Sequence, residues 1–187
     1  MLALCCGAAV PGCGASSSTS TTSRSAAKQT IPAAVRVCGS ALNAARTLLG
    51  PHSTVRITDS KPANIECRIT GAGIHLDVNA QAAPRAWEQF DTVAVHQAQA
   101  NETGTAQNNP QLPIDLVPQG DAQAVWIPAN SQLVGTNGTQ STGGSFVTVD
   151  VTRRSKRGPA SIKVAQAVAY AVLAVAPRGP NPGPAPS

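Results

Sequence analysis

The sequence predicts an α+β domain in which helices pack on an antiparallel sheet. Apolar residues recur at helical spacing in three separate stretches. Between these stretches, short runs alternate apolar with polar residues, as half-buried strands do, and turn residues separate the runs. The predicted order is helix, three strands, helix, three or four strands, helix. Hairpins of this kind bury their apolar face against the helices, which gives an α+β sandwich.

The first predicted helix precedes a group of three strands. Gly50 and Pro51 end the helix, because glycine and proline interrupt a helical pattern. Strand-like runs follow at residues 55–57, 65–69 and 74–78. The short Gly-rich link before the third run predicts a hairpin between the second and third strands. The apolar positions assigned to the helix are Val35, Cys38, Leu42, Ala45 and Leu49.

The second half of the chain shows the same alternation of patterns. Pro84 suits the first turn of a helix, in which Trp87, Phe90 and Ala94 form an apolar stripe. The apolar stretch of the last helix is shorter than the ~20 residues that a membrane span needs, which favours a buried core helix. The remaining elements are expected as a polar loop at residues 101–111, strands at 112–116, 125–127, 133–134 and 147–151, and a helix at 160–176.

The chain is predicted to have four parts. Residues 1–13 form a signal-like segment, and residues 14–30 form a flexible linker rich in Ser and Thr. Residues 31–177 carry the α+β domain. Residues 178–187 are rich in proline and are expected to form a disordered, extended tail.

The N-terminus is similar to the end of a bacterial lipoprotein signal. A short apolar run ends in Gly12 and Cys13, where a peptidase would cut before a cysteine that receives a lipid. Pro11 fits this pattern poorly, and the first basic residue is Arg24, so we expect the true start to lie upstream. We therefore predict export, a lipid anchor on Cys13 and an extracytoplasmic location at the cell membrane. The alternative is a buried or disordered apolar segment of a cytosolic protein.

Two cysteines lie in the body of the chain. Cys38 falls on the inward side of the first helix and Cys67 on the inward side of the second strand. A disulfide between them would fix the helix to the sheet, and such bonds persist outside the cytosol. The alternative is a pair of separate buried thiols that pack as small hydrophobic groups.

These features resemble a group of actinobacterial lipoproteins whose domain has no assigned function. The resemblance rests on the leader that ends at a cysteine, the Ser/Thr spacer, Cys38, residues 41–50, residues 65–69 around Cys67, residues 124–126 and the Ala-rich last helix. It covers about residues 31–177. It implies an α/β sandwich of the photosystem-subunit and nuclear-import-factor type, and an envelope location. It implies no chemistry.

The sequence carries no recognisable catalytic or metal motif. Its histidines are His52, His75 and His96, and none belongs to a motif that pairs it with a nucleophile. No His-x-x-x-His or paired Cys-x-x-Cys pattern is present, so we expect no metal and no cofactor. The glycines at 135–144 precede a strand and lack a following lysine, which indicates a hairpin loop and not a phosphate loop. Asp115, Asp121 and Asp150 are scattered in the sequence.

The formal net charge of +5 is concentrated in one run, so a general nucleic-acid surface is not expected. This run is a candidate contact for anionic phospholipid near the anchor or for an acidic partner, and the simplest alternative is a solvated loop. Its basic residues are Arg153, Arg154, Lys156 and Arg157.

Three functions remain open. The first is a non-enzymatic envelope module that binds a protein or a small ligand. The second is an extracytoplasmic hydrolase or lipid-handling enzyme, which an apolar cleft at Trp87, Phe90 or Trp126 with a titratable group inside would favour. The third is a cytosolic protein without an anchor or a disulfide.

Overall fold

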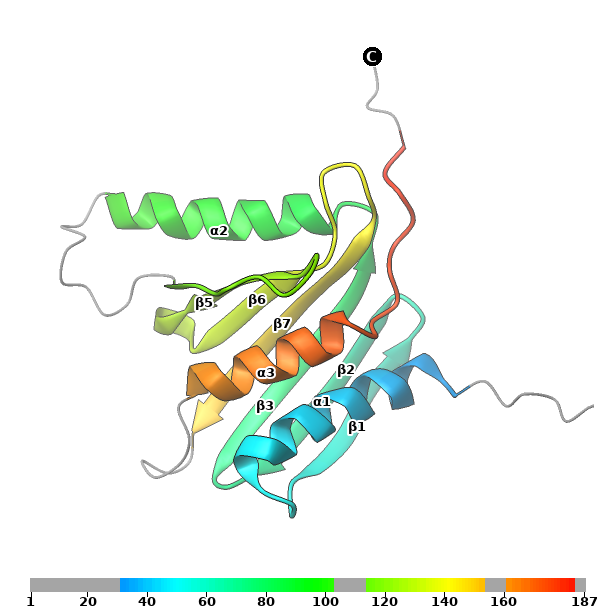
Figure 1. Cartoon of the computed structure of the whole chain (residues 1–187), viewed down its shortest axis with the longest axis vertical. Coiled ribbons are helices and arrows are strands. Elements are labelled where there is room, and N and C mark those ends of the chain that lie inside the picture. The colour runs from blue at the N-terminus through cyan, green and yellow to red at the C-terminus, as the bar shows by residue number, and fades with distance from the viewer. Residues whose placement is uncertain (1–30, 103–113, 154–160, 184–187) are drawn as a thin grey trace, which may run out of the picture. The chain divides into compact units, whose positions relative to one another are not determined.

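The alternating runs of the sequence pair into one antiparallel sheet, and the amphipathic stretches form helices on its two faces (Figure 1). The computed structural model describes residues 31–102, 114–153 and 161–183. The fold class and the order of elements are confirmed. In chain order the elements are α1 (Ala33–Leu49), β1 (Thr54–Lys61), β2 (Asn64–Gly71), β3 (Ile74–Ala83), α2 (Ala86–Glu102), β4 (Ile114–Asp115), β5 (Gln123–Ile127), the 3₁₀ turn η2 (Pro128–Asn130), β6 (Gln132–Thr136), β7 (Gly144–Arg153) and α3 (Ser161–Leu173).

The strand order is β1-β2-β3-β7-β6-β5-β4. Each strand pairs antiparallel with its neighbour, and the predicted β2–β3 hairpin is present. The joint at the centre is β3 with β7, which brings residues 74–83 beside residues 144–153 over their whole length. This long-range pairing joins the two halves of the chain into one sheet.

The main core lies between the sheet and the helix pair α1 and α3, which run side by side over one face (Figure 1). Alternate residues of β2, β3 and β7 point into this core, including Ile69, Leu76 and Val149, which are fully buried. Alanines on both helices let their backbones approach, and the Ser40 hydroxyl donates a hydrogen bond to the Ala171 carbonyl at 2.9 Å. The covered face therefore accounts for most of the apolar pattern of the sequence.

The buried stripe of α1 differs from the predicted one by a small rotation. Ala34, Val37 and Ala41 are buried, whereas Val35 is 50% exposed. Positions 34 and 35 both lie one turn before Cys38, so the spacing alone permits either, and packing against α3 and the sheet selects Ala34. The helix ends as predicted at Gly50, whose φ of 90° suits glycine and whose N–H bonds the Arg46 carbonyl at 3.0 Å.

Helix α2 covers the opposite face, but only half of it. Phe90 packs with Val125, Ile127 and Val134 in a second, smaller core over β5, β6 and β7. The helix extends to Glu102, so the loop predicted to begin at residue 101 begins later, and the rest of that loop lies outside the described residues. Strand β4 is also shorter than predicted, with two residues. None of the described helices lies over the face of β1, β2 and β3 opposite α1.

The predicted pairing of the two body cysteines is present. Cys38 of α1 and Cys67 of β2 form a disulfide, with their Cα atoms 5.9 Å apart. Both side chains are buried at 1% exposure. The bond therefore links α1 to the second strand inside the main core, as the disulfide interpretation requires, and the separate-thiol alternative is not supported.

The Pro-rich tail is extended, as predicted, but its first residues are docked and not disordered. Gly179 donates its N–H to the Gly144 carbonyl at 2.9 Å, and the Ser145 hydroxyl bonds the Pro177 carbonyl at 3.0 Å. Gly179 lies so close to the Ala83 backbone that any side chain would clash with it. Composition alone indicates disorder here, whereas glycines on both partners permit close backbone contact. Residues 184–187 lie outside the described part.

A tyrosine links helix α3 to the segment between β4 and β5. Tyr170 donates its hydroxyl to the Val117 carbonyl at 2.7 Å, and burial raises the pKa of this phenol above its usual range.

Among the described residues, none of the helices is both long and apolar enough to cross a lipid bilayer.

Candidate functional site

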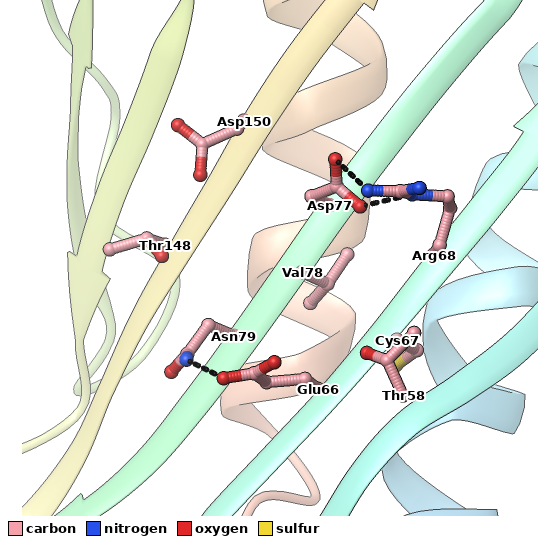
Figure 2. A pocket seen from close by; sticks show the side chains of 9 residues that line it. All are labelled: Thr58, Glu66, Cys67, Arg68, Asp77, Val78, Asn79, Thr148 and Asp150. Carbon is pink, nitrogen blue, oxygen red and sulfur yellow. Dashed lines mark hydrogen bonds and ion pairs between the residues drawn. The ribbon is translucent and has the colours of Figure 1, made fainter.

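The uncovered half of the sheet presents a polar surface, here called the open face. Strand alternation directs the apolar residues of β2, β3 and β7 into the main core, so the intervening polar residues point the other way. The face is hollowed over these strands, with a volume of about 390 Å³ (Figure 2). The polar side chains that line the hollow are Thr58, Glu66, Arg68, Asp77, Asn79, Thr148 and Asp150.

One row of the open face crosses five strands. Each residue of the row is paired with the next one on the neighbouring strand. From β1 through β2, β3 and β7 to β6, the row consists of Arg56, Arg68, Asp77, Asp150 and Gln132. The row thus sets two arginines side by side and two carboxylates side by side. Like charges directly opposite one another destabilise a sheet, so an arrangement of this kind needs compensation.

Hydrogen bonds supply part of this compensation. Arg68 holds Asp77 with two bonds, Nε to Oδ1 at 2.6 Å and Nη2 to Oδ2 at 3.1 Å (Figure 2). This ion pair, together with the hydrogen bonds, raises the pKa of the Arg68 guanidinium. Asp150 accepts a bond from the Gln132 amide at 2.7 Å and makes no ion pair with any described residue. Within the described part of the chain, Asp150 is therefore positioned by a neutral amide and has no cationic partner.

Glu66, on the same face, is also a carboxylate that accepts hydrogen bonds from neutral side-chain amides. Its Oε1 accepts the amide of Asn79 at 3.0 Å and the amide of Asn64 at 3.1 Å (Figure 2 shows the former). Asn64 also reaches Asp59 at 3.3 Å, and Lys61 bonds Asp59 at 2.9 Å, which lowers the pKa of the Asp59 carboxyl. The carboxylate of Glu66 is thus fixed in place by two amides.

The hollow as a whole is acidic. Its described lining contains Glu66, Asp77 and Asp150 and one cation, Arg68, although the whole chain is formally +5. Because amides fix two of these carboxylates, their positions are set before any partner arrives, which reduces the entropy lost on binding. This arrangement can accept hydrogen bonds from a group that carries positive charge.

The sequence-predicted residues fall in different places. His75 lies on the open face, as predicted, with Nδ1 3.1 Å from the Thr70 hydroxyl. His52 is exposed in the turn after α1, and the side chain of His96 lies outside the description. Asp115 and Asp121 are exposed and away from the hollow, whereas Asp150 lies within it.

The remaining predicted sites are largely untested. Arg153 ends β7, but Arg154, Lys156 and Arg157 lie outside the described residues, as does Cys13. In the described ranges, no group of three or more His, Cys, Asp or Glu side chains is arranged to hold a metal ion. The glycine-rich stretch at residues 135–144 joins β6 to β7, which agrees with a hairpin loop.

The open face escaped the sequence analysis. Glu66, Arg68 and Asp77 appear there only as the polar members of strand patterns, and Asp150 appears as a scattered acid. The outward phase of each strand could have identified them as surface groups. The pairing of β3 with β7 could not be read from local patterns, and this pairing is what places Asp77 opposite Asp150.

Comparison with protein-family models, with curated proteins and with solved structures finds no match for this chain.

Proposed function

We propose that this chain is an exported, lipid-anchored envelope domain that binds a partner through its open face without catalysing a reaction. The observation that carries the binding proposal is the acidic hollow on the half of the sheet that α2 leaves uncovered. A solvated face needs no amides to fix its carboxylates, whereas a binding surface gains from such preorganisation. The expected partner is a protein that presents a basic side chain.

Electrostatic complementarity supports this choice of partner. Glu66 and Asp150 each keep a carboxylate oxygen without a bond to any described residue, so each can accept a bond from an incoming cation. Charges of this kind act on association rate and specificity more than on raw affinity. A basic partner would also relieve the like-charge contact of Asp77 with Asp150.

Cross-linking in living cells tests the binding proposal. A photoreactive phenylalanine analogue in place of Thr148 lies on the floor of the hollow, and the same analogue in place of the exposed Lys163 on α3 is the control. We expect a discrete adduct at position 148 and none at position 163. The substitution Asp150→Asn should weaken the adduct about fivefold, or roughly 1 kcal/mol. Equal adducts at both positions, or no effect of Asp150→Asn, would contradict the proposal.

Two observations support the proposed location in the cell envelope. The Cys38–Cys67 disulfide is a type of bond that persists in oxidising compartments, and the signal-like segment precedes the domain. An anchor with more than one acyl chain binds a membrane far more firmly than a single chain does. Together they support an extracytoplasmic domain held at the cell membrane by Cys13.

Metabolic labelling with an alkyne fatty acid tests the anchor. The full gene is expressed from its native start, with Cys13→Ala as the variant and Cys6→Ala as the matched control. We expect Cys13→Ala to abolish the label and to move the protein from the membrane fraction to the soluble fraction, because the lipid is attached at Cys13. Cys6→Ala should leave both unchanged. Equal labelling of the wild type and Cys13→Ala would remove the anchor from the proposal.

A further inference from the structure

A second hollow lies beside the first turn of α2, on the flank away from the open face. Its volume is about 360 Å³, within the ~300–1,000 Å³ range of small-ligand sites. None of the described side chains that line it is ionisable. They are Trp87, Gln123, Thr139, Gln140 and Ser141.

The indole of Trp87 is held in a fixed orientation. It packs against Phe90, one turn further along α2, with ring centroids 5.8 Å apart and planes tilted by 44°. Phe90 is buried in the smaller core, whereas Trp87 keeps part of its surface open to the hollow. The other tryptophan of the chain, Trp126, is only 7% exposed. Trp87 therefore offers a rigid aromatic surface where Trp126 does not.

Several polar groups around this ring keep unused hydrogen-bonding capacity, although the hydroxyls of Thr139 and Ser141 lie 3.4 Å apart. The Gln123 and Gln140 amides and the Trp87 indole N–H form no hydrogen bond with any described residue. The turn that carries Gln140 is itself fixed, since the Thr139 hydroxyl lies 2.8 Å from that of Thr142 and the Thr139 N–H bonds the same oxygen at 3.1 Å. The two glutamine amides and the indole N–H are therefore available to a ligand, and the turn that carries Gln140 is held by hydrogen bonds beside the Trp87 ring.

This set of groups selects a class of ligand. An anion would require a cation, and a cationic ligand would favour carboxylates, but the described part of the lining has neither. An apolar ligand would leave the amides and hydroxyls unpaired, which is costly. A neutral sugar combines a C–H face, which stacks on an indole, with hydroxyls that both donate and accept hydrogen bonds. We propose that the hollow beside Trp87 binds a neutral saccharide, independently of the open face.

The two tryptophans make the test specific. In a ¹H–¹⁵N NMR spectrum of the purified full chain, each indole N–H gives its own signal, and the buried Trp126 serves as an internal reference. The probes are maltotriose, cellotriose and N,N′-diacetylchitobiose at millimolar concentration. We expect at least one of them to shift the Trp87 signal in a saturable way while the Trp126 signal stays in place.

Variants then connect the shift to the lining. Gln140→Ala, at an exposed position of the turn, should weaken binding about fivefold or more through the loss of hydrogen bonds. Trp87→Ala should abolish binding, but it also removes a packing contact, so Gln140→Ala is the decisive variant. Gln89→Ala removes an amide from the other flank of α2 and should change nothing. No shift with any probe, equal shifts of both indoles, or unchanged affinity in Gln140→Ala would overturn the proposal.

Discussion

Replacing Cys38 and Cys67 together by alanine is expected to lower the free energy of unfolding by about 3–4 kcal/mol. The bond closes a loop with a sequence separation of 29, and the stabilisation follows from the smaller number of conformations open to the cross-linked unfolded chain. For a domain of this size the loss corresponds to a fall in the midpoint of thermal unfolding of about 10 °C. Chemical denaturation of both proteins under the same buffer conditions measures it.

Reducing agent provides the matched control. It should destabilise the wild type by a similar amount and leave the double alanine variant unaffected, because only the wild type has a bond to lose. A thiol assay on the unfolded, unreduced protein should find neither Cys38 nor Cys67 free. An unchanged unfolding midpoint in the double variant would show that the bond contributes little, and labelling of Cys38 and Cys67 in the unreduced wild type would show that it is not formed.

Local patterns predicted most of the secondary structure. The strands β2, β3 and β7 follow from alternation, because each has one buried face and one more exposed face. The disulfide followed from the inward phase of Cys38 and Cys67. Where the prediction missed, packing decided between options that spacing allows equally, as at Val35, or glycines permitted contacts that composition hides, as at Gly179.

The candidate sites were harder to predict because they depend on long-range pairing. The open face requires Asp77 and Asp150 to be neighbours, and nothing local in either strand encodes that register. The hollow at Trp87 requires the β6–β7 turn to lie beside the start of α2. The sequence identified Trp87 as an inward stripe residue and as a possible cleft residue. It could not show which neutral groups would surround the ring.

Asn137 also makes long-range contacts that local sequence patterns do not reveal, and its substitution is expected to lower the stability of the domain strongly. The sequence indicates a tight turn at Asn137 and Gly138, but the turn residues of the structure are Gln140 and Ser141, between the bridged Thr139 and Thr142. The side chain of Asn137 is only 4% exposed and spans two elements. Its Nδ2 donates to the Leu173 carbonyl at the end of α3, and its Oδ1 accepts the Ser145 N–H of β7, both at 2.7 Å. The Asn137 side-chain amide thus bonds a backbone carbonyl at the end of α3 and a backbone N–H near the start of β7.

Substituting Asn137 by alanine is expected to lower the free energy of unfolding by about 2–4 kcal/mol, because a buried carbonyl and a buried N–H each lose their partner. Asn137→Asp keeps the acceptor for Ser145 but loses the donor to Leu173, so its amide at position 145 should exchange with solvent more slowly than in the alanine variant. Asn181→Ala, on the exposed tail, removes one longer bond to Gly143 at 3.3 Å and should cost less than about 1 kcal/mol. Equal losses for Asn137→Ala and Asn181→Ala would mean that water replaces the buried amide, and that the junction of α3 with β7 is open to solvent.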